Sequence, residues 1–214
     1  MSDFQKQSLF GLTYPLFIFM FLTAGVTFVD QMMLSSYSDN LAATVSLANQ
    51  ILGIAYDISG LFAVGSLIII SQYLGRDEVD EAKNVAVASM KISLFFCFGI
   101  AAILDLGAPY FVDWVDVPKN IRSDVLLYIY IISIAMMFNG FISAATSVMR
   151  GFGHTLEILI LGILVNILYL SLEYVLLFGY GPIPSMGVKG SALATLIVRG
   201  GMILGIFFVV QYRI

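Results

Sequence analysis

Long apolar stretches alternate with short polar connections along the whole chain. Six of these stretches are long enough to cross the hydrocarbon core of a bilayer as a helix, which takes about 20 residues. They cover residues 9–34, 47–73, 85–106, 125–148, 158–178 and 191–210. The gaps hold a polar break at 35–40, a charged loop at 76–84 and an irregular Gly- and Pro-containing connection at 107–118. The pattern therefore predicts an all-α integral membrane protein, with residues 1–214 forming one six-helix transmembrane bundle.

Composition agrees with a bundle inside a membrane. The hydrophobic share is 60% and the charged share 11%, whereas a soluble domain carries about 25% charged residues. The mean hydropathy is +0.97. The net charge of −4 is small and scattered, which argues against a nucleic-acid partner. Cys97 is the one cysteine, so we expect neither a disulfide framework nor a thiolate metal site.

Lys and Arg in the connections predict the orientation of the bundle, because cytoplasmic loops carry more of them. With the N-terminus in the cytoplasm, the inner set outnumbers the outer set by five to three. We therefore expect both termini to be cytoplasmic. The inner set is Lys6, Arg76, Lys83, Arg150 and Arg213, and the outer set is Lys119, Arg122 and Lys189.

Polar and small residues recur at intervals of three or four in several predicted helices, which places them on one helix face. Packing between membrane helices explains the Ser, Thr and Gly members of these stripes. Packing does not require an acid, so for Asp57 and Glu173 a functional role and a structural pairing both stay open. The repetition predicts a central polar lining. Its candidate residues are Gln50, Asp57, Asn139, Asn166, Tyr169 and Arg199.

Asp30 and Arg199 are the other charged candidates inside apolar stretches. A carboxylate in the membrane interior costs about 2.5–3.5 kcal/mol on insertion scales and usually faces a bundle interior or a wet cavity. Asp30 also stands late enough in its stretch to reach the interface. We expect Arg199 to pair with an acid, or to reach polar surroundings through its long side chain.

Enzyme motifs do not occur in this pattern. The sequence has no Gly-x-Ser-x-Gly motif, and His154, the one histidine, falls in a predicted connection. We therefore expect no enzyme activity, no cofactor and no resident metal.

Several short motifs follow one another in a specific order. They are V-D-Q at 29–31, L-A-A at 41–43, S-Q-Y-L-G at 71–75, R-G-F-G-H-T at 150–155 and L-L-F-G at 176–179, then Pro184, Gly187, Gly190, Ala192, Ala194, Thr195 and Arg199. In this order and spacing they resemble the N-terminal six-helix half of the multidrug and toxic compound extrusion (MATE) family. The resemblance implies one lobe of a twelve-helix transporter.

The resemblance also implies which residues couple ion movement to transport. The family acid of the first helix falls on Asp30. A second acid, in the fifth helix of some members, stands five residues before a Phe-Gly pair, which here corresponds to Glu173. The chain departs from the family at Tyr169, where some members have Asn, and at Tyr174, where Pro is common.

From the resemblance we expect an antiporter in the plasma membrane, driven by H⁺ or Na⁺, that exports drugs or other organic cations and amphipathic compounds. Sodium, if it is the coupling ion, would be held at Asp30. A homodimer or a missing second half would complete the twelve helices. Two alternatives stay open: a non-transporting fragment or half-subunit that needs a second bundle, and a lipid-linked flippase of the same superfamily, which would have a more cationic cavity.

Overall fold

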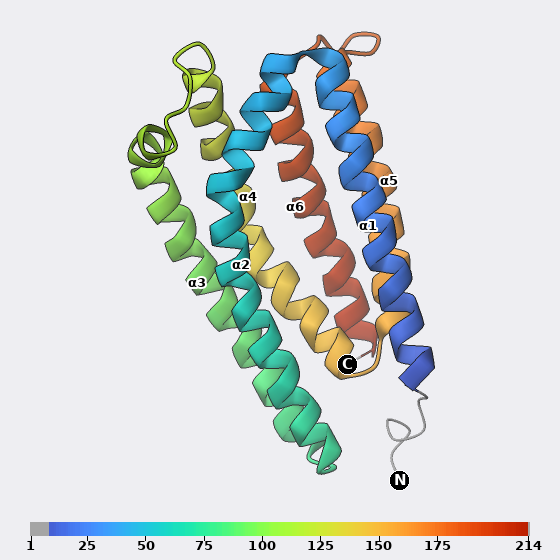
Figure 1. Ribbon diagram of the computed structural model, residues 1–214. Helices are drawn as coiled ribbons and strands as arrows, with labels where there is room; N and C mark the ends of the chain where they lie inside the picture. Colours follow the sequence, from blue (N-terminus) through green and yellow to red (C-terminus); the bar gives the residue numbers. More distant parts are fainter. Residues whose placement is uncertain (1–8, 214) are drawn as a thin grey trace.

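A computed structural model describes residues 9–213 as six long helices joined by short connections (Figure 1). The predicted all-α bundle is confirmed, and each of the six helices is long and apolar enough to cross a membrane. Within the described residues, the β-structure is limited to an isolated bridge between Tyr180 and Ile183. The helices are α1 (Leu9–Tyr37), α2 (Asp39–Gly75), α3 (Val79–Trp114), α4 (Arg122–Gly151), α5 (Thr155–Phe178) and α6 (Val188–Arg213).

The helices are longer, and the connections shorter, than the sequence pattern predicts. The polar break at 35–40 is reduced to Ser38, and the charged loop at 76–84 is a turn at 76–78. The helices α2 and α3, of 37 and 36 residues, are about 55 Å long at 1.5 Å per residue, well beyond the ~30 Å hydrocarbon core. Their joined ends extend past the other helices at one end of the bundle (Figure 1).

The predicted irregular connection at 107–118 is wrong for residues 107–114, which are helical. The helix α3 continues through Gly107 and Pro109 to Trp114, and the connection covers only 115–121. Ala108 and Val112 on the same turns are fully buried, so packing holds the helix together where Pro109 removes a backbone hydrogen bond. An ion pair between Arg122 and Asp113, 2.6 Å apart, closes this connection at the surface.

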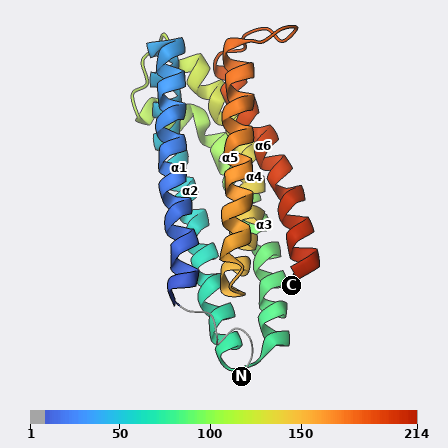
Figure 2. The same cartoon turned by 90° about the vertical axis from the view of Figure 1, so that its right-hand side faces the viewer.

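Helix α4 forms the centre of the bundle. It is the most buried of the six helices and contacts α2, α3, α5 and α6. Helix α1 is the least buried and packs chiefly against α5, beside which it lies in Figure 2. The bundle therefore has a well-buried helix, α4, at its centre and a largely exposed helix, α1, at its edge.

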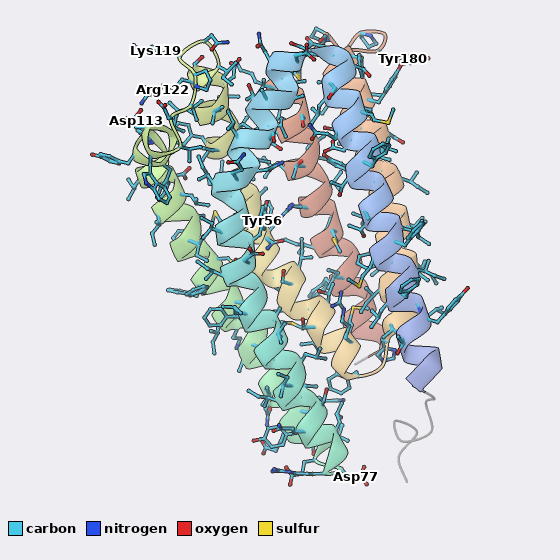
Figure 3. The ribbon with its side chains drawn as sticks, in the orientation of Figure 1. Tyr56, Asp77, Asp113, Lys119, Arg122 and Tyr180 are labelled. Atoms are coloured by element: carbon cyan, nitrogen blue, oxygen red, sulfur yellow. The ribbon has the colours of Figure 1, made fainter. Side chains whose placement is uncertain are left out.

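The connections fall into two groups at opposite ends of the bundle. Asp77 lies at one end, together with the first residues of α1 and the last of α6, whereas Lys119, Arg122 and Tyr180 lie at the other (Figure 3). The same two groups of connections carry the inner and outer sets of Lys and Arg residues from which the orientation was predicted. Lys6, which belongs to the inner set, is outside the described residues, and the cytoplasmic location of the termini stays a prediction.

Gly140 determines how closely α3 approaches α4. A methyl group at this position would overlap the Ser93 carbonyl oxygen and lie 2.7 Å from the Cys97 Sγ atom. We expect Gly140→Ala to lower the thermal unfolding midpoint by roughly 5 °C, because overpacking costs about 1–3 kcal/mol. The measurement is a thermal melt of the detergent-purified protein. Gly60→Ala is the matched control, since no atom lies within 4 Å of a methyl group there; equal losses in both variants would contradict this account.

Candidate functional site

A cavity of about 520 Å³ lies between α1, α2, α4, α5 and α6. This volume suits a ligand of drug-like size, because such sites measure roughly 300–1,000 Å³. Apolar side chains such as Phe19, Ile132 and Met202 form part of the wall. The polar part consists of Thr23, Thr27, Asp30, Asn49, Tyr56, Tyr128, Asn139, Asn166, Tyr169, Thr195 and Arg199.

The structure brings most of the predicted site residues together. Five of them, Asp30, Asn139, Asn166, Tyr169 and Arg199, line this cavity. Glu173 is fully buried in the adjoining wall. The sequence pattern thus identified residues on α1, α4, α5 and α6 that share one cavity.

Gln50 and Asp57 are not among the described residues that line the cavity. Gln50 lies in a separate groove between α2 and α3, and Asp57 is exposed. Their chain neighbours Asn49 and Tyr56 face the cavity instead. Successive side chains on a helix are about 100° apart, so a polar stripe assigned one position too far along the chain faces a different neighbouring helix. This corrects the predicted stripe on the second helix.

Asp30 and Glu173 belong to a hydrogen-bonded cluster at one end of the cavity. The Tyr169 hydroxyl donates to Asp30 Oδ1 at 3.0 Å, which joins α5 to α1. The Ser191 hydroxyl donates to Glu173 Oε1 at 2.8 Å, which joins α6 to α5. The Glu173 Oε2 atom is buried and has no hydrogen-bond partner among the described residues. Asp30 is the acid that acts on Glu173 electrostatically.

A glycine allows α6 to come close enough for this cluster to form. A methyl group at Gly190 would lie 2.5 Å from the Leu176 carbonyl oxygen. Gly190 directly precedes Ser191, so the close approach of the two helices brings the Ser191 hydroxyl to the Glu173 carboxylate. This glycine is one of the positions by which the chain resembles the MATE family.

Arg199 lies in the cavity wall and contacts neutral groups. Its Nη1 atom donates to Asn139 Oδ1 at 2.9 Å. Its guanidinium carbon is 4.8 Å from the centroid of the Tyr56 ring, in a cation–π arrangement. Tyr56 lies about midway along the bundle (Figure 3). Among the described residues, no carboxylate forms an ion pair with Arg199, so the expected pairing with an acid is wrong.

The sequence analysis missed several polar cavity residues, for different reasons. Asn49 and Tyr56 are seven residues apart and share a helix face, but the stronger Gln50–Asp57 stripe obscured them. Thr195 stands between Ser191 and Arg199 at steps of four, a stripe that was visible in the sixth predicted helix. Tyr128 had no clear periodic signal, because its neighbours three and four residues away are apolar (Val125, Ile131 and Ile132), apart from Asp124 at the start of the helix.

The cluster also limits how a cation is held. Among the described residues, no three His, Cys, Asp or Glu side chains group as a metal site. A sodium ion at Asp30 would therefore be coordinated by carboxylate oxygens together with neutral oxygens, such as the Tyr169 hydroxyl.

Comparison with known proteins identifies the family. A family model described as MatE matches residues 15–175. The "Uncharacterized transporter YisQ" of Bacillus subtilis (strain 168) is 30% identical over 207 residues, which cover 97% of this chain and 46% of that protein. The "Probable multidrug resistance protein NorM" of Acinetobacter baylyi is 22% identical over 205 residues, which cover 94% of this chain and 44% of that protein. The chain thus spans less than half the length of these curated relatives.

Solved structures show the same fold. An outward-facing multidrug resistance transporter of the MATE family matches with a TM-score of 0.85 and 21% identity, over 94% of this chain and 44% of that chain. A MOP superfamily transporter from Pyrococcus furiosus also gives a TM-score of 0.85 with 21% identity, over 94% of this chain and 43% of that chain. The six-helix bundle therefore corresponds to one lobe of a longer transporter fold. Because the family model matches most of the chain, this protein belongs to the MatE family of membrane transporters.

Proposed function

We propose that the protein is a cation-coupled antiporter that exports organic cations and other amphipathic compounds across the plasma membrane. One observation carries the proposal: the Asp30 carboxylate stands on a cavity of about 520 Å³ inside an apolar bundle, next to the buried acid Glu173. A carboxylate in such a place attracts a cationic substrate and takes up a proton. NorM relatives described as probable multidrug resistance proteins support this function.

Protonation of the acid cluster links ion movement to substrate release. Ionised Asp30 attracts a cationic substrate into the cavity, and a proton from outside neutralises the carboxylate and weakens this attraction. Two neighbouring carboxylates in an apolar interior resist ionising together, so Asp30 and Glu173 act as one proton-binding unit. Return of the proton to the cytoplasm restores the charge and resets the site.

Helix α1 is the element that can respond to this change of charge. It carries Asp30, is the least buried helix and packs chiefly against α5. Tyr169 on α5 donates to Asp30, so protonation of the carboxylate alters the contact between these two helices. Pro15 in the first turns of α1 removes one backbone hydrogen bond, which favours bending there.

The two alternative functions differ in what they require of the cavity and of the chain. A flippase for lipid-linked anions would require a cationic cavity, whereas here Arg199, the one cationic residue among the described residues that line it, is outnumbered by the two acids Asp30 and Glu173.

The half-subunit alternative is supported by a chain that spans less than half the length of its relatives. In that case a second copy or another six-helix segment supplies the second bundle, and light scattering separates a dimer from a monomer of 23.4 kDa.

We expect Asp30→Asn to abolish efflux of ethidium driven by an imposed H⁺ or Na⁺ gradient in proteoliposomes. Asparagine still accepts the Tyr169 hydrogen bond but neither ionises nor binds a proton. The rate should fall to that of protein-free vesicles. Asp57→Asn, the same change at an exposed position of another helix, should leave the rate unchanged. Full gradient-driven transport by Asp30→Asn would refute the proposed coupling.

Replacement of Glu173 tests the second acid separately. Glu173→Gln keeps an oxygen for the Ser191 hydroxyl and removes the titrating group, so we expect H⁺-driven efflux roughly tenfold slower and with a flatter dependence on pH. Efflux rates measured over a series of pH values give both quantities. Glu157→Gln, at the start of the same helix and away from the cavity, serves as the control. An unchanged pH profile in Glu173→Gln would exclude this residue from the proton-binding unit.

A further inference from the structure

We propose that Phe19 of α1 is the inner gate of the bundle. It separates the main cavity and its acid cluster from a second cavity at the end predicted to be cytoplasmic, and it holds back the coupling proton until α1 shifts. The inference rests on the proposed function in one respect, since it takes Asp30 as the acid that carries the proton. It goes further in naming the route by which the proton leaves and the residue that closes this route.

The second cavity, here called the inner cavity, has a volume of about 150 Å³ and lies between α1, α4, α5 and α6. Phe19, Ile142 and Met202 line both cavities, so these three side chains form the partition between them. The inner cavity extends to Arg150 in the last turn of α4, at the end of the bundle where α1 begins. It is smaller than the roughly 300–1,000 Å³ of sites for drug-sized ligands, so it suits water and a proton rather than the substrate.

Arg150 makes the far end of the inner cavity polar. Its Nε atom is buried and has no hydrogen-bond partner among the described residues. A buried donor needs a partner, and this cavity has room for several water molecules at about 30 Å³ each. The guanidinium charge also opposes the passage of cations. The inner cavity is therefore able to hold water at its Arg150 end, and the charge there limits how freely a proton crosses it.

Hydroxyl groups connect the partition to the acid cluster on the other side. Thr23 and Thr27 line the main cavity on the turns of α1 between Phe19 and Asp30. Thr23 donates its hydroxyl proton to the Phe19 carbonyl and Thr27 to the Thr23 carbonyl, so both hydroxyl oxygens can accept hydrogen bonds from water. At 1.5 Å per residue, Phe19 and Asp30 are about 16 Å apart along the helix. The gate and the acid cluster therefore lie at opposite ends of the main cavity.

Phe19 is the member of the partition that can move. It stands on α1, the least buried helix, which also carries Asp30, whereas Ile142 and Met202 belong to one apolar cluster on α4 and α6. The Phe19 ring lies against Gly162 of α5, where a methyl group would overlap it. A shift of α1 along α5 therefore moves the ring away from Gly162 and joins the two cavities. An apolar constriction excludes water and ions while it is closed.

Helix packing alone explains the placement of Phe19 less well. A ring that served only to pack α1 against α5 would be enclosed on its remaining sides. Phe19 is half-buried and borders a cavity on each side. Phe21, two residues further along α1, is 75% exposed and lines neither cavity. The position of Phe19 at the boundary therefore reflects the arrangement of the cavities and not the aromatic content of α1.

Proton leak in the absence of substrate tests the gate. Proteoliposomes loaded with the pH-sensitive dye pyranine receive a pH gradient, and valinomycin with K⁺ balances the charge. We expect Phe19→Ala to dissipate the gradient roughly tenfold faster than the wild type or more, because the smaller side chain merges the two cavities. Phe21→Ala, the same change on the same helix, should match the wild type. Equal rates in Phe19→Ala and the wild type would overturn the proposal.

Two further variants test the route and guard against misfolding. Asp30→Asn added to Phe19→Ala should return the leak to the wild-type rate, because the route starts at the acid cluster; a leak that persists would overturn it. If Phe19→Ala does not fold, Gly162→Ala displaces the same ring from the α5 side and should raise the leak. Gly25→Ala, where no atom lies within 4 Å of a methyl group, should not. A folded Gly162→Ala variant with the wild-type rate would then count against the gate.

The leak assay contains no substrate, which keeps this proposal separate from the antiport function. A leak that depends on Phe19 and Asp30, together with a wild-type chain that does not move ethidium, would contradict only the antiport function. Gradient-driven ethidium efflux in a chain whose Phe19→Ala variant does not leak would contradict only the gate.

Discussion

Ionisable side chains inside an apolar bundle must find polar partners, and in this protein those partners are neutral groups on other helices. Tyr169 donates to Asp30, Ser191 to Glu173 and Ser133 to Asp105, and Arg199 donates to Asn139. These bonds connect α1 to α5, α5 to α6, α4 to α3 and α6 to α4. The Arg199–Tyr56 contact adds α2. The polar groups that cost most to bury thus help to hold the six helices in one arrangement.

Neutral partners have a consequence that salt bridges would not have. A salt bridge cancels both charges, whereas a hydroxyl or an amide satisfies hydrogen bonds and leaves the net charge in place. Asp30 and Arg199 both line one cavity, and neither forms an ion pair with another described residue. Structure and proposed function therefore use the same side chains, and a change in protonation acts on helix packing as well as on the substrate.

Packing differs between the central helix α4 and the edge helix α1. The buried helix α4 forms a stable centre, and Gly140 allows α3 to pack closely against it. Helix α1, which carries Asp30, has few such contacts. Because α1 buries the least surface, a shift of α1 costs less packing energy than a shift of the central helix α4.

The sequence by itself determined the membrane class, the six helices and most of the charged residues of the site. The length of an apolar stretch is read directly from the sequence. An acid within such a stretch is also recognised from the sequence, whichever direction its side chain takes in the fold. Connections were less predictable, because Gly107 and Pro109 end helices in water but are tolerated where buried neighbours such as Ala108 and Val112 support the turn. Only the tertiary structure decided the rotation of each helix and the partner of each polar group. The choice between Gln50 and Asn49 on α2 depends on a turn of about 100°, and the Asn139 partner of Arg199 lies 60 residues away on another helix, so neither is encoded in local spacing.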